Sequence, residues 1–287
     1  MEYFGFTFFS PCDILFIQMD PEILIGTSGY DYPEWSGVFY PPEVKRKDYL
    51  LYYSTVFNAL ELNNTFYNMP DSKRIESFME RSENRVALSI KANRSLTHEV
   101  DTLWKNKALD FKEALAPAKE KNLLSTVLFQ FPQSFHYTAQ NRFYLSDLIQ
   151  EFEGFPLVIE FRHIEWIKDS VFEGLLKRGV SVAFCDMPQL NALPNTDFSD
   201  SVYTRFIGPQ AYIRLHGRNA QAWYADSATQ DSGSRYNYDY SESEIFEFVP
   251  VIKAARRENR KVSVFFNNHP KGSSPKDAKI LMKMLNY

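Results

Sequence analysis

Cysteine is scarce in this chain of 287 residues, which contains two, Cys12 and Cys185. Small secreted domains that depend on disulfides carry many more, so nothing in the sequence demands an oxidising compartment. Cys185 ends an apolar run and is predicted to be a buried small side chain. We therefore expect a protein of the cytoplasm.

Long apolar runs are also missing. No stretch reaches the roughly 18 apolar residues of a membrane-spanning helix, so we expect no membrane partner. The segment 1–18 is rich in Phe and Ile, but it lacks the basic residues of a signal peptide and contains Glu2 and Asp13. We interpret residues 1–20 as an N-terminal extension. Because no linker or repeat divides the rest, residues 21–287 are predicted to form one domain.

An excess of basic charge is absent as well. The 32 Lys and Arg residues are outnumbered by 36 Asp and Glu residues, for a net charge of −4. This balance argues against a broad surface for nucleic-acid backbone, but it leaves room for a small basic pocket. Neither a Walker loop nor a GxGxxG motif occurs, and no cofactor is indicated. The short segment Gly26-Thr27-Ser28-Gly29 either presents backbone N–H groups to an anion or is a tight turn.

Eight short apolar runs, each ending in polar residues, are the strongest positive signal. Helical patterns separate most of them. This alternation predicts an α/β fold, a (β/α)8 TIM-type barrel of eight parallel strands with its chemistry at their carboxyl ends. An irregular segment, 187–210, separates the sixth and seventh runs and leaves little room for a helix. The predicted strands are 23–28, 59–63, 86–91, 126–130, 157–162, 180–186, 211–216 and 262–268.

Local signals mark the ends of several predicted helices. Asp71 is a candidate N-cap, and Ser241 begins a Ser-Glu-Ser-Glu helix start. Ser274-Pro275 has the order of a cap followed by proline in the first turn. Residues 107–121 have a helical pattern that Pro117 is expected to interrupt.

Polar residues at the strand ends define the candidate site. Side chains two residues apart on a strand share a face, so Glu61 pairs with Asn63, Glu160 with Arg162, and Arg214 with His216. Four further strand ends carry Lys91, Gln130, Asp186 and Asn268. We expect these groups to meet at one mouth of the barrel. They either bind a ligand there or form a salt-bridge network that closes the barrel end.

The residue types suggest roles for this cluster. Glu61 and Glu160 are candidate acid and base, or alternatively counter-ions of the basic residues. His216 is the best candidate among the histidines for proton transfer. Arg162 and Arg214 suit the clamping of a phosphate or carboxylate, and Lys91 is a third cation or an imine-forming amine. Further candidate ligand-binding residues are Asn63, His98, Gln130, Asp186 and Asn268.

The segment after the seventh run is rich in aromatic and basic residues. Trp223, Tyr236 and their neighbours, together with Arg218, either stack on a ligand or fold back on the barrel rim. A metal site would require several of His98, His163, His216, Glu61, Glu160 and Asp186 to converge. Because no HxH or HxxxH pair is present, the sequence identifies no metal ligands.

Ordered motifs along the chain resemble one known family. They include Gly26-Thr27-Ser28-Gly29-Tyr30, Glu61-Leu62-Asn63-Asn64-Thr65-Phe66-Tyr67, Glu160-Phe161-Arg162-His163 and Tyr212-Ile213-Arg214-Leu215-His216-Gly217. From Ile23 to the C-terminus the chain is similar to the YecE-like family, number seventy-two in the series of domains of unknown function. The resemblance implies a TIM-type barrel and the same strand-end residues. It implies no reaction.

Three functions are consistent with these patterns. The first is an enzyme that acts on an anionic substrate, a phosphate ester, including one at a nucleic-acid terminus. The second is a module that binds a nucleotide, an oligonucleotide or a sugar without chemistry. The third is a carbohydrate-active enzyme that uses Glu61 and Glu160. The expected partner is a small anionic ligand or a nucleic-acid end, and the sequence does not indicate an oligomeric state.

Overall fold

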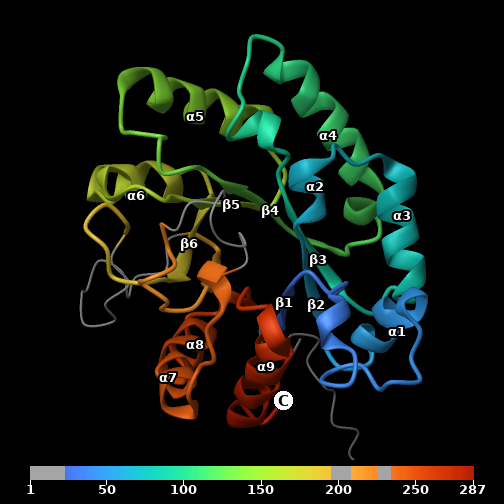
Figure 1. Cartoon of the computed structure of the whole chain (residues 1–287). Helices are drawn as coiled ribbons and strands as arrows, with labels where there is room; N and C mark the ends of the chain where they lie inside the picture. Colours follow the sequence, from blue (N-terminus) through green and yellow to red (C-terminus); the bar gives the residue numbers. More distant parts are fainter. Residues whose placement is uncertain (1–22, 195–207, 225–233) are drawn as a thin grey trace, which may run out of the picture.

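Eight parallel strands form a closed barrel in a computed structural model of the chain, in the sequential order β1 to β8. The structure describes residues 23–194, 208–224 and 234–287. Figure 1 shows the strands at the centre, with the helices arranged around them. The predicted fold class is confirmed. The strands are β1 (Ile23–Ser28), β2 (Ala59–Leu62), β3 (Ala87–Lys91), β4 (Leu124–Gln130), β5 (Leu157–Glu160), β6 (Ser181–Asp186), β7 (Gln210–Leu215) and β8 (Lys261–Phe266).

Nine helices and several short 3₁₀ turns connect the described strands. The helices are α1 (Tyr49–Ser54), α2 (Asn64–Tyr67), α3 (Ser72–Arg81), α4 (Trp104–Glu120), α5 (Ala139–Glu151), α6 (Asp169–Leu176), α7 (Glu242–Phe246), α8 (Phe248–Arg257) and α9 (Ser273–Met284). After β6, residues 187–194 form no helix, and the predicted irregular segment then continues into residues outside the described part. The proposed extension 1–20 also lies outside it.

Two of the four predicted helix signals are confirmed in the structure, and two are wrong. Asp71 caps α3 by accepting the N–H of Arg74, and Ser241 forms a capping box with Glu244 at the start of α7. The expected interruption at Pro117 is wrong, because α4 continues through this residue to Glu120. The predicted cap at Ser274 is also wrong, since α9 begins at Ser273 after Gly272.

The barrel interior is filled by side chains from alternate strand positions, as expected for a barrel of this size. An apolar cluster occupies its middle, formed by Leu24, Ala59, Leu128, Val158, Tyr212 and Phe265. Towards the amino ends of the strands, Gln210 joins Thr126 and Ser263 through hydrogen bonds of 3.0 and 2.7 Å. The apolar cluster therefore separates this small polar group from the polar groups at the carboxyl ends.

A larger apolar core lies between the strands and the helices, and it contains most of the aromatic residues. Gly26 on β1 permits one close approach within it. A Cβ atom at this position would lie 2.0 Å from the carbonyl oxygen of Ala59. Tyr53 fills the adjacent space, and its hydroxyl accepts the N–H of Thr27 at 2.8 Å and donates to the carbonyl of Ala59. Glycine is thus the residue that lets β1 and β2 meet beside α1.

Candidate functional site

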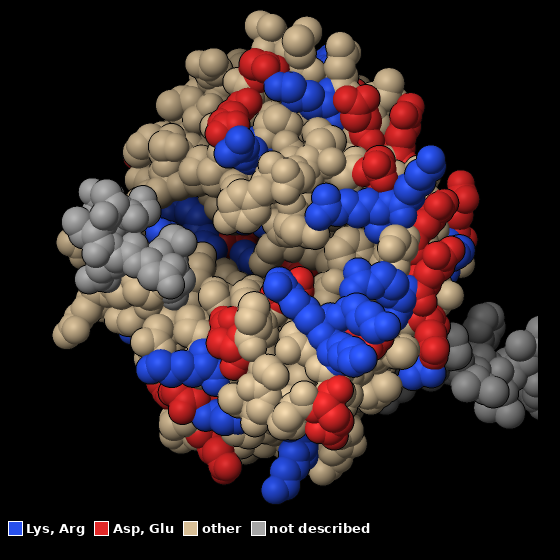
Figure 2. All heavy atoms as spheres, turned by 45° about the vertical axis from the view of Figure 1, so that its right-hand side comes forward, with Lys and Arg blue, Asp and Glu red and all other residues tan. Residues whose placement is uncertain are grey.

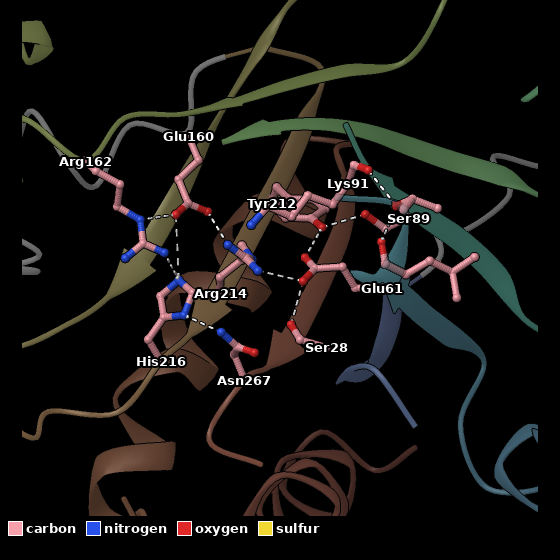
Figure 3. A network of polar contacts seen from close by, with 12 residues as sticks. Ser28, Glu61, Ser89, Lys91, Glu160, Arg162, Tyr212, Arg214, His216 and Asn267 are labelled. Atoms are coloured by element: carbon pink, nitrogen blue, oxygen red, sulfur yellow. Dashed lines mark hydrogen bonds and ion pairs between the residues drawn. The ribbon is translucent and has the colours of Figure 1, made fainter. Parts of the chain in front are cut away.

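A network of charged side chains spans the carboxyl end of the barrel (Figure 3). It contains Glu61 from β2, Glu160 from β5 and Arg214 from β7, each with 0–1% of its surface exposed. Arg162 and His216 follow directly on β5 and β7. The predicted pairs Glu160–Arg162 and Arg214–His216 do share the inner face of their strands, because their side chains contact one another across the barrel.

Arg214 bridges the two glutamates. Its Nη1 donates to Glu160 at 2.5 Å, and its Nη2 donates to Glu61 at 2.6 Å. Each carboxylate therefore has a guanidinium partner, which is the counter-ion arrangement that the sequence left open. A buried charge set of this kind is stable only when every member is paired, because an unpaired buried charge costs several kcal/mol.

Glu61 is held by two further hydroxyl groups. Ser28 on β1 donates to Oε1 at 2.6 Å, and Tyr212 on β7 donates to Oε2 at 2.7 Å. The Tyr212 hydroxyl in turn lies 2.6 Å from the hydroxyl of Ser89 on β3. Since Tyr212 gives its proton to Glu61, Ser89 is the donor in this contact. Burial, followed by the charge of Glu61, raises the pKa of Tyr212 well above its ordinary value.

Arg162 links Glu160 to His216. Its Nε donates to Glu160, and its Nη2 lies 3.0 Å from Nε2 of His216. Nδ1 of the same ring lies 2.9 Å from the side-chain amide of Asn267. Because a guanidinium has no acceptor, Nε2 must accept, and the ring proton resides on Nδ1. The structure places Nδ2 of Asn267 opposite Nδ1, and because two donors cannot bond each other, the amide of Asn267 has to turn over to accept the ring proton through its oxygen.

Electrostatics sets the protonation state of these groups. Burial opposes ionisation of Glu160, but Arg162 and Arg214 outweigh it and hold the pKa of this carboxyl well below its usual range. Burial and the same two cations place the pKa of His216 well below its ordinary value. At neutral pH Glu160 is thus an anion and His216 is a neutral imidazole. A carboxyl group that stays ionised is poorly suited to act as a general acid.

Lys91 at the end of β3 is the third basic residue of the site. Its Nζ lies 4.1 Å from the centroid of the Phe66 ring. Burial is the largest cause that lowers its pKa to about 7, and the Arg214 charge adds to this effect. His98 lies nearby, with its ring edge-on to Phe66 at 4.8 Å and its Nδ1 2.9 Å from the hydroxyl of Thr97.

Two of the predicted amide residues lie at the same end of the barrel. Gln130 ends β4 beside Glu160 and donates to the carbonyl of Phe131 at 2.8 Å. Asn63 precedes α2, and its Oδ1 atom is buried without a hydrogen-bond partner. Nε of Arg214 is likewise buried and unpartnered. Buried polar atoms are nearly always satisfied in proteins, so these two atoms identify contacts that a ligand or water would complete.

Asp186 and Asn268 do not face the network. Cys185 pairs in register with Arg214, so Asp186 is on the outer face of β6, where Arg218 and Tyr240 bind its carboxylate. Asn268 binds Asp277 at 2.7 Å, while Asn267 is the residue that contacts His216. The predicted inward positions on these two strands are therefore wrong by one residue, and such a shift exchanges the two faces of a strand.

Arg218 is engaged on this outer side as well. It donates to Asp186 at 3.0 Å and to Glu247 at 2.7 Å, and Glu244 lies 3.5 Å away. These three carboxylates neutralise it. Its contacts therefore differ from those of Arg162, whose Nη1 atom contacts the sulfur of Met187.

Aromatic side chains from the segment after β7 lie beside the network. The ring of Tyr236 is 6.0 Å from that of His216, and the guanidinium carbon of Arg162 is 5.8 Å from the centroid of Trp223. Residues 225–233 between them are outside the described part of the chain. In the same segment, Tyr238 and Tyr240 bind acidic residues of the protein itself. Tyr238 and Tyr240 therefore fold back on the protein, whereas Trp223 and Tyr236 lie beside His216 and Arg162.

The segment Gly26-Thr27-Ser28-Gly29 consists of the last three residues of β1 and the glycine that follows, and it offers no free donor at two of its positions. The N–H of Thr27 is bound by Tyr53, and the N–H of Gly29 donates to the carbonyl of Glu61 at 2.9 Å. Tyr32 donates to the carbonyl of Ser28. The segment is therefore the end of a strand, and the expectation of a tight turn at these four residues is wrong.

Two groups of possible metal ligands occur among the described residues. Glu160, Cys185 and His216 form a buried group, and His136, His163 and Glu165 form one at the surface, with ligand atoms within 4.8 Å of one another in each. In the buried group, Arg162 and Arg214 already bind Glu160, and a cation there would be repelled by both guanidiniums. In the surface group, Glu165 accepts the N–H of Tyr137.

The molecular surface is hollowed on the face shown in Figure 2, with basic and acidic side chains visible inside the hollow. Mixed charge at the bottom of a depression is what the barrel-end network would present to solvent.

The sequence did not predict four residues of the site, namely Ser28, Tyr212, Asn267 and Cys185. The period-two pattern on β7 could have identified Tyr212, since it lies two residues before Arg214.

Comparisons with known proteins agree with this fold. The model of the family described as "Protein of unknown function DUF72" matches residues 24–287. The UPF0759 protein YunF of Bacillus subtilis is 27% identical over 276 residues, which is 92% of this chain and 94% of YunF. Among the described residues, no helix has the length and apolar character needed to cross a bilayer.

Solved structures give the same result. The DUF72 family protein TM1631 of Thermotoga maritima superposes with a TM-score of 0.81 at 30% identity, covering 92% of this chain and 99% of that protein. The DUF72 family protein EF0366 of Enterococcus faecalis has a TM-score of 0.78 at 23% identity, covering 93% and 96%. The matched residues include the whole barrel and its polar carboxyl end, and we conclude that this chain belongs to the DUF72 family.

Proposed function

We propose that the protein is an enzyme that binds an anionic substrate, a phosphate ester, at the carboxyl end of its barrel. One observation carries the proposal. Three basic groups, Arg162, Arg214 and Lys91, gather there around two carboxylates, Glu61 and Glu160. With Lys91 protonated, the group has one positive charge in excess, in a buried place where charge is costly. An anion would balance it.

Arg162 and Lys91 are the groups that would hold this anion. Arg214 is committed to both glutamates, whereas Nη1 of Arg162 contacts only the weak acceptor sulfur of Met187 among the described residues. No described carboxylate lies within ion-pair distance of the Lys91 amine. Guanidinium groups match phosphate oxygens through paired hydrogen bonds, so Arg162 would orient the phosphate group. Lys91 would add a positive charge beside it. Anion binding would also raise the pKa of Lys91, and binding would take up protons near pH 7.

In this proposal Glu160 and His216 are positioning residues. Glu160 fixes both guanidiniums, and neutral His216 fixes the outer end of Arg162. Proton transfer near neutral pH then falls to Lys91, and Glu61 holds Arg214 in place. The aromatic rings of Trp223 and Tyr236 would cover the part of the substrate beyond its anionic group.

The test is a thermal-shift titration with inorganic phosphate, a sugar phosphate, the same sugar without phosphate, and a short 5′-phosphorylated oligonucleotide. We expect the phosphorylated compounds to raise Tm, since ligand at 100 times its Kd adds about 2.7 kcal/mol of stability. Arg162→Gln should abolish the shift. Arg46→Gln, which removes an exposed arginine paired with Asp31, should retain it. An equal shift in Arg162→Gln would place the anion elsewhere and overturn the proposal.

The alternatives are less well supported. A glycoside hydrolase needs a carboxyl group with a raised pKa as its acid, whereas the pKa of Glu160 is lowered and Glu61 accepts three hydrogen bonds. A binding module without chemistry is favoured by the rings of Trp223 and Tyr236, and the oligonucleotide in the titration tests it.

We also propose, from the sequence alone, that the protein is related to the YecE-like members of the DUF72 family and that it is located in the cytoplasm.

A further inference from the structure

Lys91 is one of several described lysines that lie over an aromatic ring, but four of the others, Lys105, Lys119, Lys168 and Lys279, are exposed, whereas Lys91 is half-buried at a strand end. It also differs from the lysines that form ion pairs. Lys107 lies 2.6 Å from Asp101, and Lys112 and Lys276 bind Glu151 and Asp239. No described carboxylate lies within 4.0 Å of Nζ of Lys91, which instead lies over the face of the Phe66 ring. A lysine at the carboxyl end of a barrel strand without an acidic partner is placed for chemistry rather than for an ion pair.

The local structure holds Lys91 firmly at this position. Its carbonyl oxygen accepts a hydrogen bond of 2.6 Å from the hydroxyl of Thr65, which also binds the carbonyl of Leu62. The N–H of Ala92 donates to the carbonyl of Leu128 on the next strand. The backbone that carries Lys91 is therefore tied to both neighbouring strands, and the side chain extends from a rigid support.

The surroundings make the neutral amine accessible near pH 7. Burial is the largest cause that lowers the pKa of Lys91 to about 7, and the charges of Arg214 and Arg162 add to it, although Glu160 and Glu61 oppose them. A neutral amine is the nucleophilic form of lysine, and proximity to other cations is a known way in which proteins produce it. The same cations would bind the anionic group of a substrate and bring its other atoms to Lys91.

We propose that Lys91 forms an imine with an aldehyde or ketone whose phosphate group is held by Arg162. The inference deepens the proposed function, on which it rests for the anion site, by naming a carbonyl compound as the substrate class. The lone pair of Nζ attacks the carbonyl carbon, the oxygen takes up the proton that nitrogen loses, and the carbinolamine then loses water. The balance is amine plus carbonyl to imine plus water, with no oxidant or reductant.

The imine can be tested by trapping. The full-length protein is mixed at pH 7 with less than one equivalent of pyridoxal 5′-phosphate, an aldehyde that carries a phosphate group. Borohydride then reduces any imine to a stable amine, and peptide mass mapping locates the adduct. We expect the Lys91 peptide to be labelled first, with a rate that reaches half its maximum near pH 7. Surface lysines should react mainly at higher pH.

Two variants provide the controls. Lys91→Arg keeps the charge and should lose the adduct from its peptide. Lys105→Arg alters an exposed lysine that also lies near an aromatic ring, 5.7 Å from that of Trp104, and labelling of Lys91 should persist. Inorganic phosphate should slow labelling of Lys91, and pyridoxal without phosphate should react with it more slowly.

The outcomes separate the two proposals. If phosphate raises Tm but Lys91 is labelled no faster than the surface lysines, the imine is overturned while the anion site stands. If Lys91 is labelled first, but equally fast with pyridoxal and without competition by phosphate, the nucleophilic amine stands and the anion site fails. Labelling that is uniform over all lysines, with no thermal shift, overturns both.

Discussion

Arg162 donates to Nε2 of His216 over 3.0 Å, and this contact fixes the protonation state of a fully buried imidazole. Since the guanidinium is donor-only, the ring is neutral with its proton on Nδ1, opposite Asn267. The contact joins Arg162 to His216, which directly follows β7, and His216 in turn contacts Asn267, which directly follows β8. Arg162 is thereby held between Glu160 and His216, with its remaining nitrogen directed to neither.

We predict that His216 remains neutral well below the pH at which an ordinary histidine is half protonated. Its pKa in the folded protein is lowered by burial and by Arg162 and Arg214, whereas an unfolded chain protonates near pH 6.5. Between these two values the unfolded state binds more protons, so this group makes stability fall as pH drops below about 6.5. Nitrogen NMR of the imidazole should show the Nδ1–H tautomer at both pH 7 and pH 5.5.

A variant sharpens this test. Arg162→Gln removes a cation from Nε2, so the pKa of His216 should rise and its NMR signals should titrate at higher pH. Imidazolium signals from wild-type His216 at pH 6 would contradict the assignment.

We predict that Arg214→Met destabilises the fold by about 3–5 kcal/mol, the usual cost of breaking a buried ion pair by removing one partner. The loss leaves two carboxylates, Glu61 and Glu160, in a barrel interior with less positive charge. Urea unfolding measures it. Adding Glu61→Gln to Arg214→Met should recover part of the loss, because the amide carries no charge, and its oxygen still accepts from one of the two hydroxyls of Ser28 and Tyr212 while its NH2 group donates to the other. No recovery would mean that charge is not the cause.

The barrel and most of the polar residues at its carboxyl end could be predicted because the sequence contains two regular patterns. Apolar runs mark the strands, and on β2, β5 and β7 the polar residues recur at every second position up to the strand end. Glu61, Glu160, Arg162, Arg214 and His216 follow from this pattern. At the carboxyl ends of β6 and β8, two consecutive residues are polar or small, so either one could point into the barrel. They are Cys185 and Asp186 at β6, and Asn267 and Asn268 at β8. Only the pairing with β7 decides which of the two points inward.

This ambiguity gives a matched pair of variants. Asn267→Ala removes the amide that lies opposite His216 and should weaken phosphate binding, because Arg162 loses the support of a fixed imidazole. Asn268→Ala instead breaks contacts with Asp277 and with the carbonyl of Tyr238, and should cost about 1–3 kcal/mol of stability with phosphate binding retained. Thermal shift with and without phosphate measures both effects. The opposite pattern would reverse the register that we describe.

Lys91→Met should make the protein more stable at pH 7 while removing the reactive amine. The pKa of Lys91 is about 7 in the folded state and 10.5 in a free side chain, so between these pH values the unfolded state binds more protons. Wild-type stability should therefore rise with pH across this window, and the variant should lack the rise. Because one pKa unit corresponds to 1.36 kcal/mol, the lowering from 10.5 to about 7 sets an upper limit of roughly 5 kcal/mol. Lys91 is only half-buried, so water screens part of this, and we expect a gain on the order of 2 kcal/mol at pH 7. Urea unfolding at pH 7 and 9.5 tests both statements, and equal slopes in the two proteins would contradict them.

Gly26→Ala should destabilise the barrel by more than an ordinary glycine substitution. The added Cβ would lie 2.0 Å from the carbonyl oxygen of Ala59 and 2.7 Å from the hydroxyl of Tyr53, so β1 and β2 must separate beside Glu61. Overpacking of this kind costs about 1–3 kcal/mol, and here it also displaces a backbone group. Gly174→Ala is the matched control, because it lies in α6 with open space around it and should stabilise the helix by about 1 kcal/mol. Urea unfolding should thus shift the two variants in opposite directions, and a tolerated Gly26→Ala would show that the two strands can separate without loss of the barrel.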